Sequence, residues 1–347
     1  MSASRRSASL PRAFTMVELL VTIAIIAILI ALILPSLSGA RENSRTLKCA
    51  ANTRSLAQAI AVYSNDHRGR MPPAYIAADT ASALPAWALR QPGDIDSEPY
   101  IHWTRMVTGD IGTDDVQPEA FMCPAAPDGG APARRPQLGF AEPWQQRSTG
   151  LSDWQPPRMA YTVNGALMPP GTMMDHFRRK ARLVDIAEVN QPERVILATE
   201  FYDDQTVGWR AIGEFDIASR SYRPIMPFIG GSTGPMNLFN EPTLGDEPRF
   251  FYPTNNSVFD LSQLKTIYTY FGTVNVITSN AITSINAVGR RHPQRTRRDG
   301  GLANFAFLDG HIDRMHPRAT LERELWGDRF WGITGNNAVD KRQRVHP

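Results

Sequence analysis

The longest apolar stretch of the chain lies close to its start and reads FTMVELLVTIAIIAILIALILP, from Phe14 to Pro35. As a helix rising about 1.5 Å per residue, the 21 residues from Phe14 to Leu34 extend roughly 31 Å, close to the thickness of a bilayer's hydrocarbon core. From Leu19 onward only Thr22 interrupts the apolar residues, and its hydroxyl can bond back to the helix. The pattern therefore predicts a membrane-spanning helix over residues 14–35.

A short polar leader, MSASRRSASLPRA, occupies residues 1–13 and carries Arg5, Arg6 and Arg12. Positive residues beside a spanning helix stay in the cytoplasm, so we expect a single-pass protein of the cytoplasmic (inner) membrane with its N-terminus inside and its body outside. A secretory signal peptide has a shorter apolar core followed by a small-residue cleavage site. The segment 38–40, Ser-Gly-Ala, fits such a site, so removal of a signal peptide stays open as an alternative.

Glu18 places a carboxylate inside this apolar segment. An unpaired charge in a spanning helix costs about 2.5–3.5 kcal/mol on insertion scales, which makes such a residue a functional candidate with an expected partner. The alternative is a glutamate that rests in the headgroup zone near the cytoplasmic face.

The pattern of apolar and polar residues over 36–66 predicts an amphipathic continuation of the same helix, which ends near Asp66 and before Gly69. Pro35 removes one backbone hydrogen bond and is expected to kink the helix. At 100° per residue, Leu47 and Ala51 lie opposite a stripe that we expect to be buried, with Asn52 bonded to a loop of the body. The stripe contains Cys49, Asn52, Leu56, Ala59, Ile60 and Tyr63.

The only two cysteines, Cys49 and Cys123, are 74 positions apart and show no spacing that suggests a zinc site. Cys49 lies on the stripe that faces the body, and Cys123 lies in the loop segment EAFMCPAAPD. If the body is exported, we expect the two to form a disulfide that ties the helix to this loop. The alternative is a pair of buried thiols.

Residues 67–347 predict an exported α+β body. Long loops rich in proline, glycine and alanine come first, and β-branched and aromatic runs bounded by turn residues follow. In NFAFLDGHIDRM, a hairpin over residues 304–315, Asp309-Gly310 predicts a two-residue turn that pairs Leu308 with His311. We expect an antiparallel sheet packed on the long helix. The strand-like runs cover 158–165, 193–202, 208–217, 249–253 and 273–279.

The start of the chain resembles a type IV prepilin or type II secretion pseudopilin signal, in a leader that ends at Ala13, then FTMVE and a long apolar helix with a proline after it. The resemblance implies a pilin-like fold, cleavage between Ala13 and Phe14 by a prepilin peptidase, and methylation of the new N-terminus. The family usually has glycine before the cut, where this chain has Ala13. By this resemblance Glu18 contacts the amine of Phe14 on a neighbouring subunit and so acts in assembly.

A segment near the C-terminus resembles the C-terminal box of large planctomycete-type prepilin-like proteins, a histidine followed by nine residues and then Asp-Gly. The Arg291-His292 pair and the later segment GGLANFAFLDGHI, with Asp309, Gly310 and His311, carry the likeness together with Cys49, Asn52 and Tyr63 of the long helix. Sixteen residues separate His292 from Asp309 here, so an insertion of seven interrupts the box. The role of His292 is left open by this spacing.

Charge adds little to this picture. The formal net charge is +3, and without the leader 34 basic side chains face 34 acidic ones, which argues against nucleic-acid binding. The segment GRRHPQRTRRDGG predicts a solvated basic loop, with an acidic partner such as lipid headgroups, polysaccharide or another subunit as the alternative. Its arginines are Arg290, Arg291, Arg295, Arg297 and Arg298.

No nucleophile elbow, phosphate loop or HExxH motif is present, so we expect neither an enzyme nor a cofactor. Two groups of side chains are weak candidates for a divalent metal, but turn-adjacent Asp and His more often bond the local backbone, and no metal is expected. The groups are His311, Asp313 and His316, and Glu200, Asp203 and Asp204.

These patterns predict a pilin-like structural subunit that a prepilin peptidase processes and that assembles with other pilin-like subunits in the membrane. The filament would be of the type IV pilus or type II secretion pseudopilus kind. The alternative is a membrane-anchored envelope protein that does not polymerise and whose body binds a glycan through some of the seven tryptophans. Irregular tryptophan spacing favours packing in the core instead.

Overall fold

The structure is a computed structural model, and its chain divides into two compact units, residues 1–44 and 45–347. The first unit contains the apolar, N-terminal part of the long helix, and the second contains the rest of that helix and the body. The described residues are 15–77, 100–108, 118–126, 129–132, 153–154, 156, 158–169, 182–201, 224–230, 250–260, 284–293, 301–333 and 337–345.

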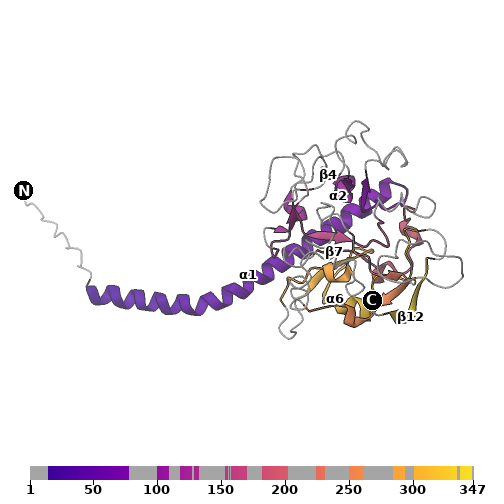
Figure 1. Ribbon diagram of the computed structural model, residues 1–347. Helices are drawn as coiled ribbons and strands as arrows, with labels where there is room; N and C mark the ends of the chain where they lie inside the picture. Colours follow the sequence, from indigo (N-terminus) through magenta and orange to yellow (C-terminus); the bar gives the residue numbers. More distant parts are fainter. Residues whose placement is uncertain are drawn as a thin grey trace, which may run out of the picture. The chain divides into compact units, whose positions relative to one another are not determined.

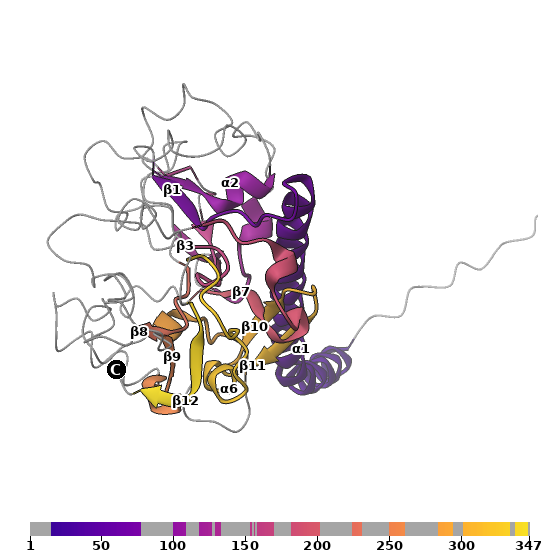
Figure 2. The ribbon, with the colours of Figure 1, turned by 90° about the vertical axis from the view of Figure 1, so that its right-hand side faces the viewer.

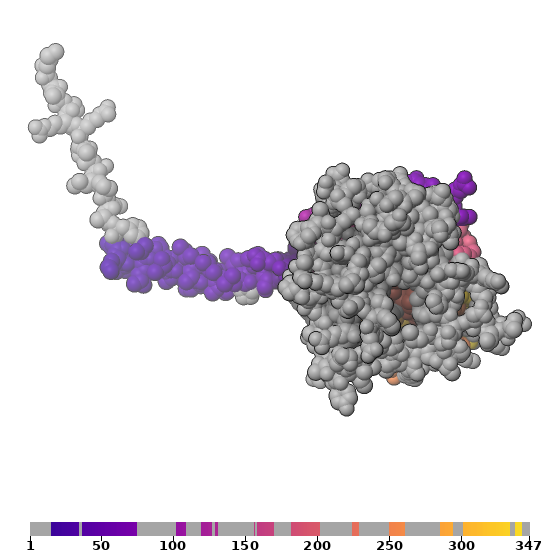
Figure 3. All heavy atoms as spheres, turned by 45° about the horizontal axis from the view of Figure 1, so that its top comes forward, coloured from indigo at the N-terminus to yellow at the C-terminus, as the bar shows by residue number. Residues whose placement is uncertain are grey.

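Helix α1 runs from Met16 to Asp66 without interruption, close to the predicted limits (Figure 1). Among the described helices it alone is long and apolar enough to cross a membrane, with a mean hydropathy of 3.1 in its most apolar window. The side chains of this window are exposed, and the segment is seen as indigo atoms in Figure 3. Pro35 lies within the helix, and the kink expected there stays a prediction.

The part of α1 from residue 45 to 66 belongs to the body and buries the predicted face. Cys49, Leu56 and Ile60 are at most 3% exposed, whereas Leu47 is 70% exposed on the opposite side. Thr53 and Ser64 are also buried. Their hydroxyls are satisfied there, because that of Thr53 donates to the carbonyl of Cys49 and that of Ser64 to the carbonyl of Ile60, each four residues earlier. The amphipathic pattern therefore predicted this packing correctly.

The remaining helices are short. They are α2 (Trp103–Thr108), α6 (Pro317–Glu322) and the 3₁₀ turns η3 (Pro118–Phe121), η5 (Ile186–Glu188), η6 (Pro192–Arg194), η8 (Asn255–Ser257) and η9 (Ser284–Ala287). The strands are β1 (Tyr75–Ala77), β2 (Tyr100–His102), β3 (Ala131–Pro132), β4 (Asp153–Trp154), β5 (Arg158–Met159), β6 (Tyr161–Val163), β7 (Ile196–Glu200), β8 (Ile229–Gly230), β9 (Phe250–Pro253), β10 (Ala303–Phe307), β11 (Ile312–Met315) and β12 (Val339–Val345).

The central sheet has the order β11-β10-β7-β6, and each neighbouring pair is antiparallel. Its two inner strands, β7 and β10, are buried at every position, which suits their mostly apolar and β-branched residues but also buries two polar side chains, Glu200 and Asn304. The predicted α+β class, a long helix packed on an antiparallel sheet, is confirmed. The predicted runs at 208–217 and 273–279 lie outside the described residues.

A second sheet, β12-β9-β8, lies beside the central sheet (Figure 2). Here β12 pairs with β9 in parallel, which the sequence patterns did not predict. Tyr252 on β9 donates its hydroxyl to the carbonyl of Gly327, 2.6 Å away, and the indole of Trp326 packs edge-on against Phe305 of β10. These contacts join the second sheet to the central one.

The predicted hairpin exists, but its register was wrong by one residue. Ala306 pairs with Ile312, and the amide of Phe307 donates to the carbonyl of His311. The loop therefore has three residues, 308–310, and the third, Gly310, has φ +90°. A turn closed by a glycine in the left-handed region is the usual geometry of a three-residue hairpin, so the Asp-Gly pair signalled the turn without fixing its length.

Candidate functional site

A disulfide joins α1 to the segment that follows η3. The sulfur atoms of Cys49 and Cys123 are 2.10 Å apart, and both residues are fully buried. Cys49 lies on the buried face of the helix, one turn before Thr53. Cys123 is held in its loop because its amide donates to the carbonyl of Gly129 and its carbonyl accepts from Ala126. The helix and the loop are thus fixed at the same point by covalent and backbone bonds.

Asn52 and Tyr161 complete the contact between helix and loop. The Asn52 amide nitrogen donates to the carbonyl of Met122 at 2.8 Å and to that of Glu119 at 3.1 Å, which confirms that this residue bonds a loop of the body. The hydroxyl of Tyr161 lies within 3.4 Å of the carbonyls of Cys49 and Met122. Burial, assisted by the nearby Glu200 carboxylate, raises the pKa of Tyr161, so the phenol stays protonated and can donate.

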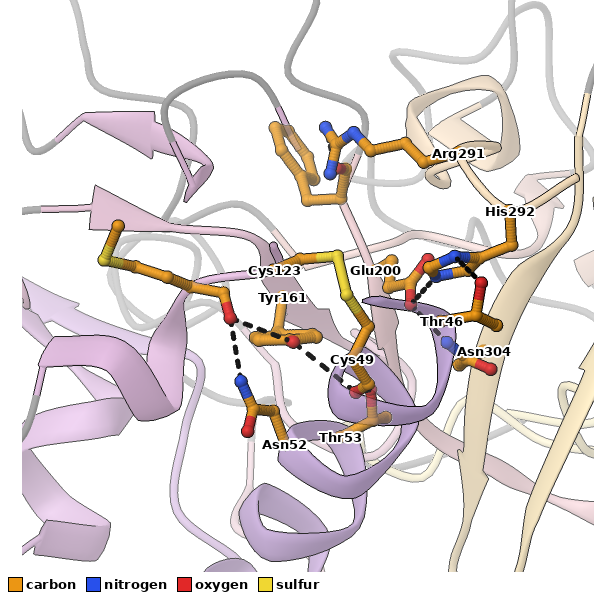
Figure 4. Close-up of a disulfide and its surroundings, with 12 residues drawn as sticks. Thr46, Cys49, Asn52, Thr53, Cys123, Tyr161, Glu200, Arg291, His292 and Asn304 are labelled. Atoms are coloured by element: carbon orange, nitrogen blue, oxygen red, sulfur yellow. Dashed lines mark hydrogen bonds and ion pairs between the residues drawn. A yellow bond between two sulfur atoms is a disulfide. The ribbon is translucent and has the colours of Figure 1, made fainter. Parts of the chain in front are cut away.

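A buried polar cluster lies beside the disulfide and is drawn from three elements (Figure 4). His292 Nε2 lies 2.7 Å from Glu200 Oε1, and His292 Nδ1 lies 3.1 Å from the hydroxyl of Thr46. The amide nitrogen of Asn304 donates to the same Glu200 oxygen at 2.6 Å. Thr46 comes from α1, Glu200 ends β7, and Asn304 lies on β10. The cluster therefore links the helix, the central sheet and residue 292.

Glu200 is the acceptor at the centre of this cluster. Its Oε1 atom accepts from both His292 and Asn304, while its Oε2 atom is buried and accepts no hydrogen bond from the described residues. A buried carboxylate oxygen without a partner is costly and calls for an explanation. One imidazole nitrogen of His292, one carboxylate oxygen of Glu200 and the two cysteine sulfurs all lie within 4.8 Å of one another.

His292 and Leu302, on the two sides of the insertion before the hairpin, are paired with each other. The amide of His292 donates to the carbonyl of Leu302 at 3.0 Å, and the amide of Leu302 donates back at 2.7 Å. Residues 294–300 lie outside the described part, between these two paired positions. Gly301 permits the closure, because a Cβ there would lie 2.4 Å from the carbonyl oxygen of His292. The described residues on the two sides of the insertion are thus held together by a β-bridge.

The other half of the predicted box lies at the hairpin turn, in a different environment. Asp309 Oδ1 accepts from the backbone amide of His311 at 3.0 Å and lies 2.6 Å from its Nδ1. The side chains of both residues are at least one third exposed, and the His311 ring stacks on Phe307. The structure does not unite Asp309, Gly310 and His311 with the buried His292 in a single site, and a role for the box stays a prediction.

Three of the candidate metal ligands, His311, Asp313 and His316, make local bonds, whereas Glu200 belongs to the buried cluster. His316 is buried, and its Nδ1 accepts from the amide of Arg318 at the start of α6. Asp313 accepts from the amide of Arg314 and lies 3.4 Å from Arg323. These contacts agree with the interpretation that turn-adjacent Asp and His bond the local backbone. Asp203 and Asp204 lie outside the described residues.

The expected solvated basic loop is wrong for its first arginine. Arg290 is 3% exposed, and its guanidinium donates to the side-chain oxygen of Asn286 and to the carbonyl of Phe259. Arg291 is half-buried and donates to the carbonyl of Phe201 at 2.9 Å. Both arginines therefore hold chain segments together. Arg295, Arg297 and Arg298 lie outside the described residues.

Three described tryptophans are core residues. Trp103, Trp326 and Trp331 are at most 1% exposed, so their indole faces are unavailable for stacking on a sugar. The indole nitrogen of Trp326 donates to the hydroxyl of Thr320, which satisfies it inside the core. The side chains of the remaining tryptophans lie outside the described part.

At the N-terminus, Ala13 and Phe14 lie outside the described residues, but Glu18 is described. Glu18 Oε2 accepts from the amide of Thr15 at 2.9 Å and from its hydroxyl at 2.8 Å, and the Glu18 amide donates to the Thr15 hydroxyl at 3.2 Å. This reciprocal pair is a capping box at the start of α1. The spacing Thr-x-x-Glu was visible in the sequence, but its capping role was missed.

Comparisons with known proteins identify the N-terminal segment. A family described as the prokaryotic N-terminal methylation motif matches residues 11–34, which cover the end of the leader and nearly all of the apolar run. No curated protein and no solved structure matches the chain significantly. The start of the chain therefore carries a prokaryotic N-terminal methylation motif, as prepilin-like proteins do, and the motif runs into a helix that is long and apolar enough to cross a membrane.

Proposed function

We propose that this chain is a pilin-like structural subunit that assembles into a filament of the type IV pilus or type II secretion pseudopilus kind. The observation that carries the proposal is the methylation motif over residues 11–34. Its continuation into the exposed apolar helix α1 and then into an α+β body supports the same class. The burial of three tryptophans favours this function over glycan binding.

In this proposal a prepilin peptidase cuts between Ala13 and Phe14 and methylates the new amine. Residues 14–35 stay in the cytoplasmic membrane with the N-terminus inside, because the leader carries three arginines and the exported side carries the body. The disulfide supports export, since such bonds persist in oxidising compartments. Mass spectrometry of the native protein tests the cut: we expect an N-methylated Phe14, whereas a start at Arg41 would identify a conventional signal peptide.

Glu18 has two candidate roles that the structure helps to separate. It caps its own helix through Thr15, and in an assembled filament its charge would meet the amine of Phe14 on a neighbouring subunit. Capping requires only an acceptor oxygen, and replacing a cap costs about 0.5–2 kcal/mol. Charge pairing requires an ionised carboxylate in a medium where an unpaired charge is costly.

Three substitutions distinguish these roles. We expect Glu18→Gln, which keeps an acceptor oxygen but loses the charge, to abolish incorporation into filaments as completely as Glu18→Ala. Thr15→Ala, which removes the cap but keeps the charge, should retain incorporation. The measurement is the amount of each variant in sheared filaments relative to its amount in membranes. Wild-type incorporation of Glu18→Gln, with loss in Thr15→Ala, would show that capping alone matters.

A further inference from the structure

We propose that Cys49, Cys123, Glu200 and His292 form a zinc site when the disulfide is reduced. The two thiolates, the Oε2 atom of Glu200 and the Nε2 atom of His292 would be the four ligands. This inference is independent of filament assembly, and it revises the expectation of no metal. The sequence spacing gave no such indication because the four residues come from four separated segments, which only the fold brings together.

The positions of the four donors fit a tetrahedral ion. Zinc binds thiolate sulfur at about 2.3 Å and imidazole nitrogen or carboxylate oxygen at about 2.0–2.2 Å, so ligand atoms lie roughly 3.3–3.8 Å apart. The two sulfurs, one imidazole nitrogen of His292 and one carboxylate oxygen of Glu200 already lie within 4.8 Å of one another. Reduction breaks the S–S bond and lets the sulfurs separate to the distance that a shared ion requires. Figure 4 shows the Glu200 side chain between the disulfide and the imidazole of His292.

The surrounding hydrogen bonds would orient the ligands. Thr46 lies at hydrogen-bond distance from His292 Nδ1, and Asn304 donates to Glu200 Oε1. Ligating histidines in zinc sites are usually held by a hydrogen bond at their other nitrogen, and ligating carboxylates are hydrogen-bonded as well. The ion would take Oε2 of Glu200 and Nε2 of His292. His292 would give up its present contact with Glu200 Oε1 and carry its proton on Nδ1, which then donates to the Thr46 hydroxyl. Glu200 Oε2 is the buried oxygen that accepts no hydrogen bond from the described residues.

Charge also favours an ion at this position. Zinc with two thiolates and one carboxylate carries a net charge of −1, and the Arg291 guanidinium lies in the same region, since it donates to the carbonyl of Phe201, the residue after Glu200. Thiolate and imidazole ligands select zinc over magnesium or calcium. All four residues are buried, so the site is of the closed, structural type without a bound water.

The redox step is a two-electron reduction of the disulfide. A phosphine attacks one sulfur and releases the other as a thiolate; water then supplies the oxygen of the phosphine oxide and the protons of the two thiols, so Cys49 and Cys123 become thiols. A dithiol gives the same two thiols by exchange, as it supplies both protons and is itself oxidised to a disulfide. Zinc then displaces the two thiol protons into solvent and binds the thiolates. In either state the same two cysteines hold α1 to the loop after η3, by a covalent bond or through the ion.

Cobalt binding to the full chain in detergent tests the site, with a phosphine reductant that carries no thiol. We expect the reduced protein to bind one Co²⁺ with a thiolate charge-transfer band and the intense visible bands of tetrahedral cobalt, and zinc to displace it. The oxidised protein should show neither band. His292→Gln and Glu200→Gln should each weaken Co²⁺ binding at least tenfold and alter the visible bands, whereas His311→Gln, an exposed histidine at the hairpin turn, should change nothing.

Two results would overturn the proposal. One is a reduced chain that binds less than one equivalent of cobalt. The other is a cobalt spectrum and affinity that His292→Gln leaves unchanged, which would mean that the thiols alone hold the ion in an unfolded chain. Thermal unfolding gives a second readout: zinc should raise the melting temperature of the reduced wild-type chain and leave that of reduced His292→Gln unchanged.

Discussion

At the level of single residues, the Asn52 amide shows how a polar group on an apolar helix face is satisfied. Its nitrogen donates to two backbone carbonyls, that of Glu119 in η3 and that of Met122 just after it, and the residue is 5% exposed. The position was predictable, because the helical period places Asn52 on the buried stripe and a buried amide needs partners.

We expect Asn52→Ala to lower the free energy of unfolding by about 1–3 kcal/mol, because two partly buried carbonyls lose their donor. Thermal unfolding of the full chain in detergent measures this. Ser55→Ala is a matched control on the same helix, since the Ser55 hydroxyl is exposed and bonds only the carbonyl of Ala51, and its effect should stay within about 0.5 kcal/mol. Equal losses in both variants would contradict the role assigned to Asn52.

The buried cluster shows what residue patterns could not predict. Thr46 lies one helical turn before Cys49 and could have been placed on the buried face from its spacing. Glu200 was recognised at the end of a strand, but with Asp203 and Asp204 as companions. Its actual neighbours, His292 and Asn304, are 92 and 104 positions away in the chain. Only the pairing of β7 with β10 and the closure at Leu302 bring them together.

At the level of elements, the chain just before β10 can pass close to a neighbouring backbone segment because residue 301 is Gly301. A Cβ at this position would lie 2.4 Å from the carbonyl oxygen of His292 and 2.5 Å from that of Arg290, both backbone atoms that cannot rotate away. Gly310 in the hairpin turn differs, because its φ is +90° but nothing lies within 4 Å of its added Cβ. The two glycines are required for different physical reasons, close approach and backbone conformation.

We expect Gly301→Ala to destabilise the protein by about 2–3 kcal/mol through overpacking, and Gly310→Ala by about 1–2 kcal/mol through left-handed strain alone. Thermal unfolding of both variants gives the comparison. Hydrogen exchange adds a local readout: Gly301→Ala should speed exchange of the His292 and Leu302 amides, which bond each other's carbonyls, and Gly310→Ala should leave them protected. Unchanged exchange in Gly301→Ala would exclude the predicted clash.

The sequence predicted most accurately the elements whose hydrophobic pattern extends over many residues. The helix limits were predicted within two residues at its start, and the buried strands β7 and β10 lie inside predicted apolar runs. The hairpin register was less predictable, since Asp309-Gly310 serves two- and three-residue turns equally well. The parallel pairing of β12 with β9 joins segments about ninety residues apart, and nothing in either segment signals its partner.

At the level of the whole molecule, the boundary between the two compact units falls after Ser44, inside α1. The buried face of the helix begins immediately afterwards, at Thr46, and continues to Ser64. The second part of α1 is therefore a core element of the body, although it is continuous with the apolar membrane segment.

Two truncations test this division. We expect a chain of residues 45–347 to unfold cooperatively, because it keeps the disulfide and the buried cluster. A chain of residues 57–347 should fail to do so, because it loses Thr46, Cys49 and Asn52 together with their partners in the body. Circular dichroism and gel filtration provide the measurement. Cooperative unfolding of the shorter chain would show that the helix is not part of the core.

The disulfide also determines how the body would respond to mechanical tension along α1. A pull on the helix ahead of Cys49 passes through the sulfur–sulfur bond to Cys123, so the segment between them, in a loop of sequence separation 74, carries no load. Without that bond the same segment could be drawn out by roughly 250 Å at about 3.4 Å per residue. The crosslink therefore acts as a strain limiter, which keeps a fifth of the chain from being stretched when the anchor is pulled.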